Sequence, residues 1–464
     1  MIKAGFYECD ITPPLGAERP GDYAKRWVEN ICDPLKTRAA VFTDGKLQIA
    51  LVGIDAIGMS ERFLHKVESA CPGIKIILSA SHCHYGGNVR DSISKIEQES
   101  ELIRRLAEED SVACDPVYRD HCLRQTITAV QMAARRMEEV EFSFGKGRVK
   151  DLIFNRRIRM KDGTTATHPG KGNPDSLDYA GPVDDELGVV GVWKKGSTEL
   201  LGFLLNFSCH PDVQDDGASP DFPGYAIETV RAVYGAKAGA VYINGPSGDV
   251  TQINNLSLTQ DIGIAISIKI GRTMGGEAVK ILACAPRGEI TTLDYRETEL
   301  KLKRVPIGPK VLADAYKKVE VNDGSNAFKI AKTRIMQSLT ISRDPEPVTM
   351  LKAVQLGPLA IANTSGEMFA QYGLDYKAGA KFPFAWYAQL ATNLLAYIPT
   401  PECFKKTGGG YETSISRFPA DTGPRILESV LRMTGEFTPE EPPKPETVPP
   451  VKKAWGYNFD RIKK

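Results

Sequence analysis

Four apolar runs along the chain each end in small residues followed by polar ones. They cover residues 74–78, 200–207, 239–243 and 350–362, the last with a turn at Gly357-Pro358. A continuous apolar run of about four to eight residues, bounded by turn-forming residues, is typical of a buried strand. In open α/β sheets, ligands bind beyond the carboxyl ends of the strands. We therefore expect the residues that follow the four runs to meet at one site.

The segments between these runs predict a hairpin and several helices. Apolar residues 39–42 and 49–54 flank Asp44-Gly45, which is a strong hairpin signal. Helical composition and spacing extend over residues 60–70, 97–110 and 115–137. Strands and helices in this order predict an α/β fold, with one large mixed-sheet catalytic domain and an active site at the C-terminal ends of its strands.

Residues 262–270 fit two different structures. Isoleucine occupies every second position from Ile262 to Ile270, which is a strand pattern. However, Thr259 begins a fair helix cap, and residues 271–282 continue at helical spacing. The periodicity alone favours a strand.

Composition excludes several classes of protein. The chain is 42% hydrophobic and 25% charged, and its 59 basic and 58 acidic residues leave a net charge of +1. Neither nucleic acid nor an anionic membrane is favoured as a partner. No apolar stretch reaches the ~20 residues of a membrane helix. The nine cysteines are scattered without a CxxC pair, which suits reduced thiols.

The two ends of the chain bear on location and domain organisation. Residues 1–5 lack the apolar core of a signal peptide, so we expect a cytoplasmic protein, or a secreted one if a leader has been removed. From Phe437 the composition shifts to Pro, Glu and Lys. We predict a catalytic domain over residues 1–436 and a Pro-rich tail over 437–464.

The chemistry that follows the strands is that of a metal site. Two of the six histidines, His82 and His84, follow the first run and precede Gly86-Gly87, which permit unusual backbone conformations. On extended backbone, this spacing would place both imidazoles on one side. His210 and Glu367 follow two other runs. Zinc needs about three or four N, O or S ligands and an open position, so a zinc hydrolase is one interpretation.

Other interpretations stay open at this point. Ser247, within Gly245–Asp249, superficially resembles a nucleophile elbow but lacks the GxSxG spacing. A non-catalytic binding module would explain the Gly-, Asp- and Thr-rich loops. His210 could simply end a strand, and Glu367 could be an acid in the first turn of a helix. His65 and His121 are ordinary core or surface residues by their context. His168, in a long polar stretch over residues 156–186, could contact a substrate or only solvent.

A set of motifs adds a family resemblance. SHCHYGG, NFSCHPD, NGPSGDVT, TSGEMF and AYIPT occur in this order, and together they resemble the motifs of the neutral, non-lysosomal ceramidases over residues 3–435. The resemblance implies a zinc site formed by His82, His210, Glu367 and Tyr397. It implies that His84 contacts the reacting oxygen, and that Arg156 and Thr251 face the substrate. It also implies a helix after the Gly-Asp motif, and therefore over residues 262–270.

The resulting hypothesis is a zinc-dependent hydrolase in which activated water attacks the amide or ester carbonyl of a small molecule. Cys83, Tyr85 and Thr251 depart from the family pattern, and the chain ends without the family's C-terminal immunoglobulin-like domain. The polar stretch 156–186 favours a substrate more polar than ceramide. The alternatives are a relative that acts on a soluble ester, lactone or carbohydrate-derived substrate, and a binding protein with a vestigial metal site.

Overall fold

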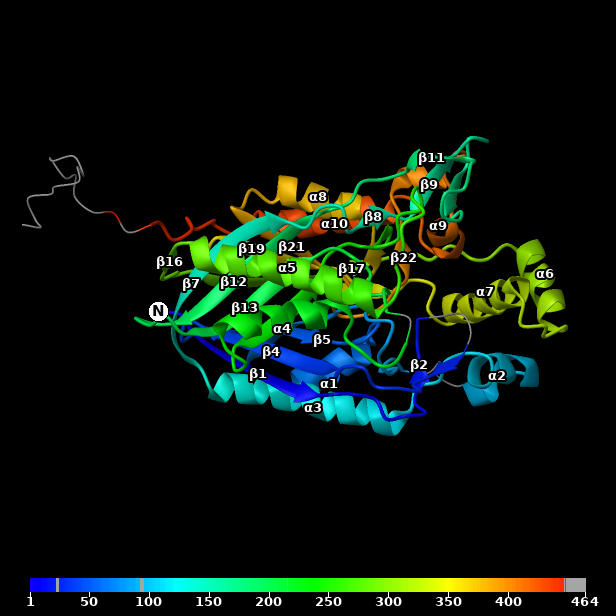
Figure 1. Cartoon of the computed structure of the whole chain (residues 1–464). Helices are drawn as coiled ribbons and strands as arrows, with labels where there is room; N and C mark the ends of the chain where they lie inside the picture. The colour runs from blue at the N-terminus through cyan, green and yellow to red at the C-terminus, as the bar shows by residue number, and fades with distance from the viewer. Residues whose placement is uncertain (22–24, 92–95, 215, 446, 448–464) are drawn as a thin grey trace, which may run out of the picture.

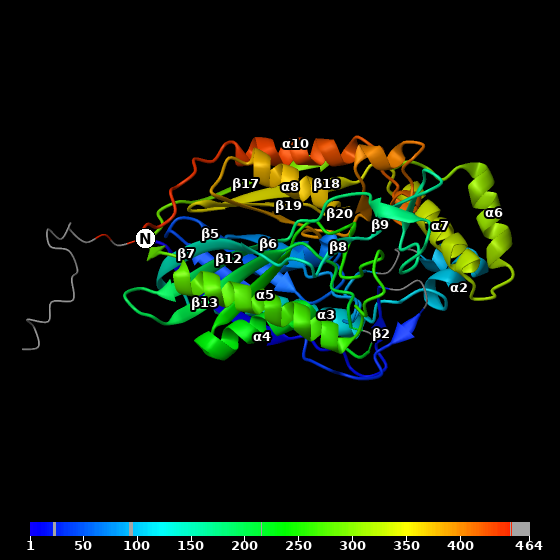
Figure 2. The ribbon, with the colours of Figure 1, turned by 45° about the horizontal axis from the view of Figure 1, so that its top comes forward.

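The structure is a computed structural model that describes residues 1–21, 25–91, 96–214, 216–445 and 447. Two sheets stack face to face, and helices cover both outer faces (Figures 1 and 2). The large sheet has nine strands in the order β14-β13-β12-β7-β1-β4-β5-β6, with β16 paired to β7. Its strands are β1 (Lys3–Asp10), β4 (Lys36–Thr43), β5 (Gln48–Ile54), β6 (Ile74–Ala80), β7 (Glu138–Arg148), β12 (Glu186–Lys194), β13 (Leu200–Phe207), β14 (Gly239–Asn244) and β16 (Arg287–Gly288).

The large sheet is mixed, as predicted. β5 pairs with β6 and β13 with β14 in parallel, whereas β4 and β5 form the expected antiparallel hairpin. The sheet curls so that β14 contacts β4, β5 and β6. Gly53 permits this approach, because a Cβ there would lie 2.7 Å from the carbonyl oxygen of Tyr242. The curl brings the carboxyl ends of β6 and β14 together.

The small sheet supplies the other half of the core. Its strands run in the order β17-β18-β19-β21, and they are β17 (Leu293–Lys301), β18 (Val348–Leu356), β19 (Leu359–Asn363) and β21 (Phe384–Ala388). The predicted turn at Gly357-Pro358 joins β18 to β19. Side chains of both sheets interlock in one buried apolar cluster that includes Phe42, Phe142 and Trp386.

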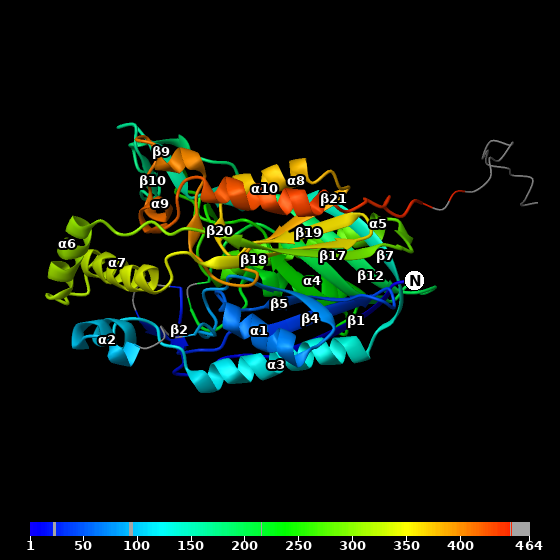
Figure 3. The ribbon, with the colours of Figure 1, turned by 180° about the vertical axis from the view of Figure 1, so that it is seen from behind.

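Helices cover the sheets from outside, as seen from behind in Figure 3. The outer face of the large sheet carries α1 (Glu61–Ala70), α3 (Pro116–Arg135), α4 (Phe222–Tyr234) and α5 (Ile264–Cys284), and the small sheet carries α8 (Ala370–Gly379) and α10 (Thr422–Thr434). α1 and α3 begin where predicted, because Ser60 and Asp115 cap them by accepting hydrogen bonds from Phe63 and Val117. The predicted helix over residues 97–110 is instead the 3₁₀ turn η1 (Ile96–Gln98) followed by α2 (Glu101–Glu108).

Residues 262–270 illustrate how packing overrides periodicity. The segment enters α5, as the family resemblance implies, so the strand pattern of its isoleucines is misleading. Gly271 and Gly275 face α4 so closely that a Cβ would lie 2.6 Å and 2.7 Å from carbonyl oxygens of Phe222 and Ala226. Two small residues four positions apart let α4 and α5 pack closely, and this packing stabilises α5 as a helix.

A helical lobe, formed by α2, α6 (Pro309–Val319) and α7 (Asn326–Arg343), projects from one end of the sheets (Figure 1). It has its own apolar cluster, which includes Leu106, Val319 and Phe328. No helix in the described part of the chain is both long enough and apolar enough to cross a membrane.

Short strands surround the ends of the sheets. They are β2 (Glu18–Arg19), β3 (Arg26–Trp27), β8 (Phe154–Asn155), β9 (Arg157–Met160), β10 (Thr165–Thr167), β11 (Ser176–Tyr179), β15 (Val250–Thr251), β20 (Glu367–Met368) and β22 (Tyr397–Ile398); two short helices, η2 (Pro401–Phe404) and α9 (Tyr411–Ile415), complete the set. The polar stretch 156–186 is thus a three-stranded sheet and its turns, rather than an open loop.

The predicted tail begins in contact with the domain. Phe437 is buried, and the carbonyl oxygen of Thr438 accepts a hydrogen bond from Gln355. The carboxylate of Glu440 accepts from the backbone of Thr291 and Thr292. Residue 446 and residues 448–464 lie outside the described residues, and the domain boundary after residue 436 stays a prediction.

Candidate metal centre

His82 lies two residues beyond β6, at the first of the predicted strand ends. Its backbone is left-handed, with φ of 66°, so the pair His82–His84 is not extended as the spacing suggested. Nδ1 of His82 donates to the carbonyl oxygen of Ile57 at 2.7 Å. This bond fixes the ring and leaves Nε2 with its lone pair.

The two glycines that follow are required for packing rather than for an unusual conformation. A Cβ on Gly86 would lie 2.9 Å from the Leu35 side chain, and one on Gly87 would lie 2.2 Å from the ring of Tyr118. The left-handed residue of this turn is His82 itself. A strained non-glycine residue of this kind is often found at functional sites.

His210, three residues beyond β13, has the same arrangement. Its Nδ1 donates to the carbonyl oxygen of Ser247 at 2.7 Å, and Ser247 follows β14. The hydroxyl of Ser247 accepts a hydrogen bond from Gln389 at 2.7 Å, and the residue is fully buried. Because His210 contacts its carbonyl and not its hydroxyl, the geometry of a serine nucleophile is absent at Ser247.

Glu367 brings a carboxylate to the two histidines. It opens β20, and the backbone N–H of Gly248 donates to the carbonyl of the next residue, Met368, at 2.8 Å. Oε2 of Glu367 lies 3.3 Å from Nε2 of His82 and 3.5 Å from Nε2 of His210. Three strand ends predicted from the sequence therefore meet.

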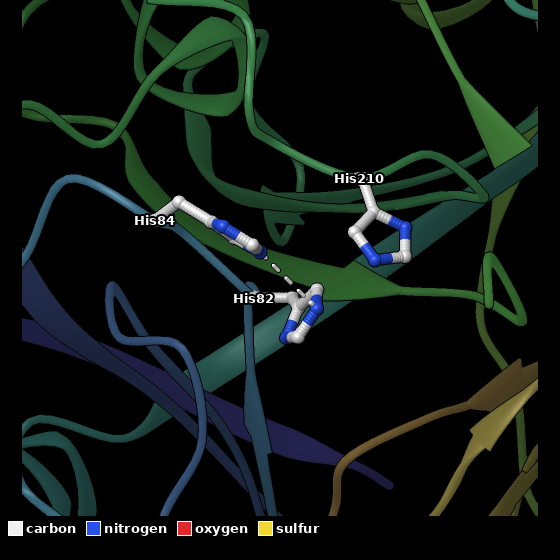
Figure 4. A group of neighbouring side chains, drawn as sticks. All are labelled: His82, His84 and His210. Carbon is white, nitrogen blue, oxygen red and sulfur yellow. Dashed lines mark hydrogen bonds between the residues drawn. The ribbon is translucent and has the colours of Figure 1, made fainter. Parts of the chain in front are cut away.

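His84 adds a third ring to the cluster. Figure 4 shows the imidazoles of His82, His84 and His210 turned toward one another. Nε2 of His84 lies 3.4 Å from Nε2 of His82, and Nδ1 of His84 lies 3.7 Å from Oδ1 of Asp212. Nitrogen atoms of the three rings all lie within 4.8 Å of one another.

The unsatisfied atoms of this cluster fit a bound cation. Nε2 of His210 and Oε2 of Glu367 are buried and have no hydrogen-bond partner in the described part of the chain. Four ligands arranged tetrahedrally at ~2.0–2.1 Å around zinc would lie ~3.3–3.4 Å apart. The separations from Oε2 of Glu367 to His82 and His210, 3.3 Å and 3.5 Å, are close to this value. These two separations therefore fit three ligand atoms around one divalent metal ion.

The protonation states also suit a metal. Burial lowers the pKa of His84 and of His210 to about 3, so both rings are neutral near pH 7. Burial opposes ionisation of Glu367, but the neighbouring histidines outweigh it and hold the pKa of this carboxyl well below its usual range. Neutral imidazoles and an anionic carboxylate are the forms that bind metal ions.

Tyr397 lies beside Glu367 because β22 pairs in parallel with β20, with the two residues in register. Its side chain is buried, and burial raises its pKa well above the ordinary value, so the phenol is protonated without a metal. The guanidinium of Arg156 lies 5.3 Å from the centre of the tyrosine ring.

Arg156 and Thr251 are placed differently from each other. Arg156 donates through Nε to Glu412 at 2.6 Å and through Nη2 to the carbonyl of Gly248 at 2.7 Å. The hydroxyl of Thr251 donates to Gln252 at 3.2 Å and accepts from the backbone of Ile253. Within the described residues, no hydrogen bond joins Thr251 to the three histidines.

Sequence reasoning missed Glu412, which is fully buried at the start of α9. Its carboxylate bridges Arg156 and Arg157 and accepts from Thr167. Its only local signal is an acid after a run of glycines, which is common on protein surfaces. The other predicted histidine of interest, His168, contacts Asn255 at 3.3 Å and lies outside the cluster of three rings.

Comparison with solved structures identifies the architecture. A ceramidase complexed with C2 superposes with a TM-score of 0.69 over 96% of this chain and 77% of that one, at 15% identity. The neutral ceramidase from Pseudomonas aeruginosa gives 0.68, over 96% and 76%, at 16% identity. This chain has the fold of the neutral ceramidases. The ceramidase fold confirms the predicted α/β class and, at the level of the fold, the resemblance seen in the motifs. A scan of protein-family models and a search of curated proteins gave no match.

Proposed function

We propose that the chain is a zinc-dependent hydrolase that cleaves an amide or ester bond, with His82, His210, Glu367 and Tyr397 as the ligands. The observation that carries this proposal is the approach of the Glu367 carboxylate to within 3.3 Å and 3.5 Å of two histidine nitrogens. Oε2 of Glu367 and Nε2 of His210 are buried there without a hydrogen-bond partner in the described part of the chain. The ceramidase fold supports a hydrolase. Zinc, when bound, supplies a Lewis acid that lowers the pKa of water from ~15.7 towards ~7.

The residues around the ligands would bind and orient the substrate. His84 and the phenol of Tyr397 would each stabilise negative charge that develops on the carbonyl oxygen. Arg156 would hold Tyr397 in place, since its guanidinium lies against the tyrosine ring and is fixed by Glu412. Thr251 would orient the polar end of the substrate from the neighbouring strand β15.

The substrate class we propose is more polar than ceramide. A cavity of about 290 Å³ opens beside His84, and its lining includes Arg19, Arg26 and Asp212. Charged walls of this kind suit a polar ligand better than two hydrocarbon chains. The charged residues of the stretch 156–186 are weaker evidence for a polar substrate than the sequence suggested. Arg159 is already paired with Asp178, and Lys171 is paired with Asp261. Soluble esters, lactones and carbohydrate-derived substrates belong to the same class.

Metal analysis and a substrate screen test the proposal together. Protein purified without chelator should contain about one zinc per chain, and His82→Ala and His210→Ala should each lose it. Acyl-amino, acyl-sugar, lactone and fluorogenic ceramide substrates would be assayed with and without chelator. Full metal content in both variants would refute the ligand set. A metal-bound protein that hydrolyses none of them would favour the binding-protein alternative, and efficient cleavage of long-chain ceramide would refute the polar substrate.

A further inference from the structure

A second cavity, of about 360 Å³, lies where the helical lobe meets the sheet domain. Its walls come from the turn after β6, from α2 and from α7. The helices α2 and α7 lie at the same end of the molecule in Figure 1. The lining residues that matter here are Gly21, Ile57, Arg90, Val112, Lys332 and Met336. The cavity therefore has both apolar and basic walls.

This cavity adjoins the candidate metal centre through two of its wall residues. The carbonyl oxygen of Ile57 accepts the hydrogen bond from His82. Gly21 lies against His84, since a Cβ on it would be 2.6 Å from Nδ1 of that ring. Gly21 also lines the smaller cavity beside His84. Two wall residues of the larger cavity thus contact the histidines directly.

Arg90 differs from Lys332, which also lines this cavity, in its lack of a partner among the described residues. Arg38, Arg119 and Arg156 have acidic partners, namely Asp55, Asp91 and Glu412, at 2.6–2.9 Å, and Arg19 beside His84 lies over the ring of Tyr85. Arg90 is an exposed residue, and its guanidinium has no hydrogen bond or ion pair with any described residue.

The other charged groups of the cavity do not neutralise Arg90. Asp91 already accepts from Ser60 and from Arg119. Lys332 donates to the carbonyl of Asp110 and adds positive charge. Glu108 is exposed on α2, and no ion pair joins it to Arg90 within the described residues.

We infer that Arg90 binds an anionic group of the substrate, so that the enzyme acts on an amide or ester that carries a carboxylate near the scissile carbonyl. This inference rests on the proposed hydrolase function and narrows its substrate class. An arginine pairs with a carboxylate through two parallel hydrogen bonds, which fixes orientation as well as charge. Ile57, Val112 and Met336 would contact the hydrocarbon part of such a substrate.

A matched pair of ligands tests this inference. N-dodecanoylglycine and N-dodecanoylglycinamide have the same acyl chain and the same scissile amide, and they differ only in the charge of the terminal group. With zinc-loaded full-length protein, kcat/KM should be about tenfold or more higher for the carboxylate, as expected for a hydrogen bond between charged groups. Arg90→Gln should remove this preference and leave the glycinamide within about threefold of wild type, while Arg90→Lys should restore part of it.

Arg124→Gln provides the control, because Arg124 is another exposed arginine, on α3, that lines neither cavity. Arg124→Gln should leave kcat/KM unchanged for both substrates. Calorimetric binding of the same two ligands separates the inference from the proposed function. A carboxylate preference in binding that Arg90→Gln abolishes, without any turnover, would refute the hydrolase and support the anion site. The inference would be overturned if the wild type binds both ligands with equal affinity or binds neither. It would also be overturned if Arg90→Gln loses the same affinity for both ligands.

Discussion

Nε2 of His84 lies 3.4 Å from Nε2 of His82, and Oε2 of Glu367 lies 3.3 Å from the same atom. His82 is therefore the centre of two possible ligand sets. One consists of the three histidines, and the other replaces His84 by Glu367. The two sets differ in burial, because His84 retains 14% of its side-chain surface whereas Glu367 retains 8% and leaves an oxygen unsatisfied. The unsatisfied oxygen favours Glu367 as the ligand.

Metal content of single variants distinguishes the two sets. We expect His84→Ala to retain about one zinc per chain, and Glu367→Ala to lose most of it, because only the second change removes a buried anionic donor. Turnover should fall in both variants. Elemental analysis after dialysis measures the difference. If His84→Ala loses its metal and Glu367→Ala keeps it, the three-histidine set is correct.

Tyr397→Phe tests whether the phenol takes part in chemistry. The substitution keeps the ring against Arg156 and removes only the hydroxyl. We expect kcat to fall by about 10²–10³, as for the loss of one donor to an oxyanion, with the melting temperature nearly unchanged. Tyr376→Phe is the matched control for the loss of a hydroxyl. Tyr376 is a buried tyrosine on the outer side of the small sheet, and its hydroxyl is hydrogen-bonded to Thr434. A kcat within threefold of wild type in Tyr397→Phe would exclude the role.

The parts of the site that the sequence could predict are those that directly follow apolar strands. His82, His210 and Glu367 each end such a run, and the curl of the large sheet and the stacking of the small one bring them together. Partners that lie far apart in sequence could not be found this way. Arg156 and Glu412 are 256 residues apart, and neither lies in a local sequence pattern that predicts contact with the other. Arg90 could not be found either, because its distinguishing property is the lack of an acidic partner.

Gly248 has a structural role that a small substitution should reveal. A Cβ at this position would lie 2.5 Å from the carbonyl oxygen of Glu367 and 3.0 Å from that of Met368. Gly248→Ala should push β20 away from the turn that positions His210, with a cost of about 1–3 kcal/mol and weaker metal binding. Gly276→Ala is the control, since nothing lies within 4 Å of a Cβ there and alanine favours the helix. Chemical unfolding and zinc titration of both variants measure these effects, and equal stability of the two would contradict the packing argument.

Glu412 should set both the stability of the site and its dependence on pH. Glu412→Gln leaves Arg156 and Arg157 buried without their anion, so we expect a loss of about 3–5 kcal/mol at pH 7. Burial opposes ionisation of Glu412, but the two arginines outweigh it and lower its pKa below the ordinary 4.5. A carboxyl with a lowered pKa stabilises the fold above about pH 4.5 and loses this effect as the pH falls through its folded value. The difference in the free energy of unfolding between wild type and Glu412→Gln should therefore shrink on acidification below about pH 4.5, which urea unfolding at several pH values would measure.

Glu402→Gln, which removes an exposed acid paired with Lys405 at 3.9 Å, is the control and should change the free energy of unfolding by less than about 1 kcal/mol. A Glu412→Gln loss that is equally small, or independent of pH, would show that the two arginines do not depend on this carboxylate.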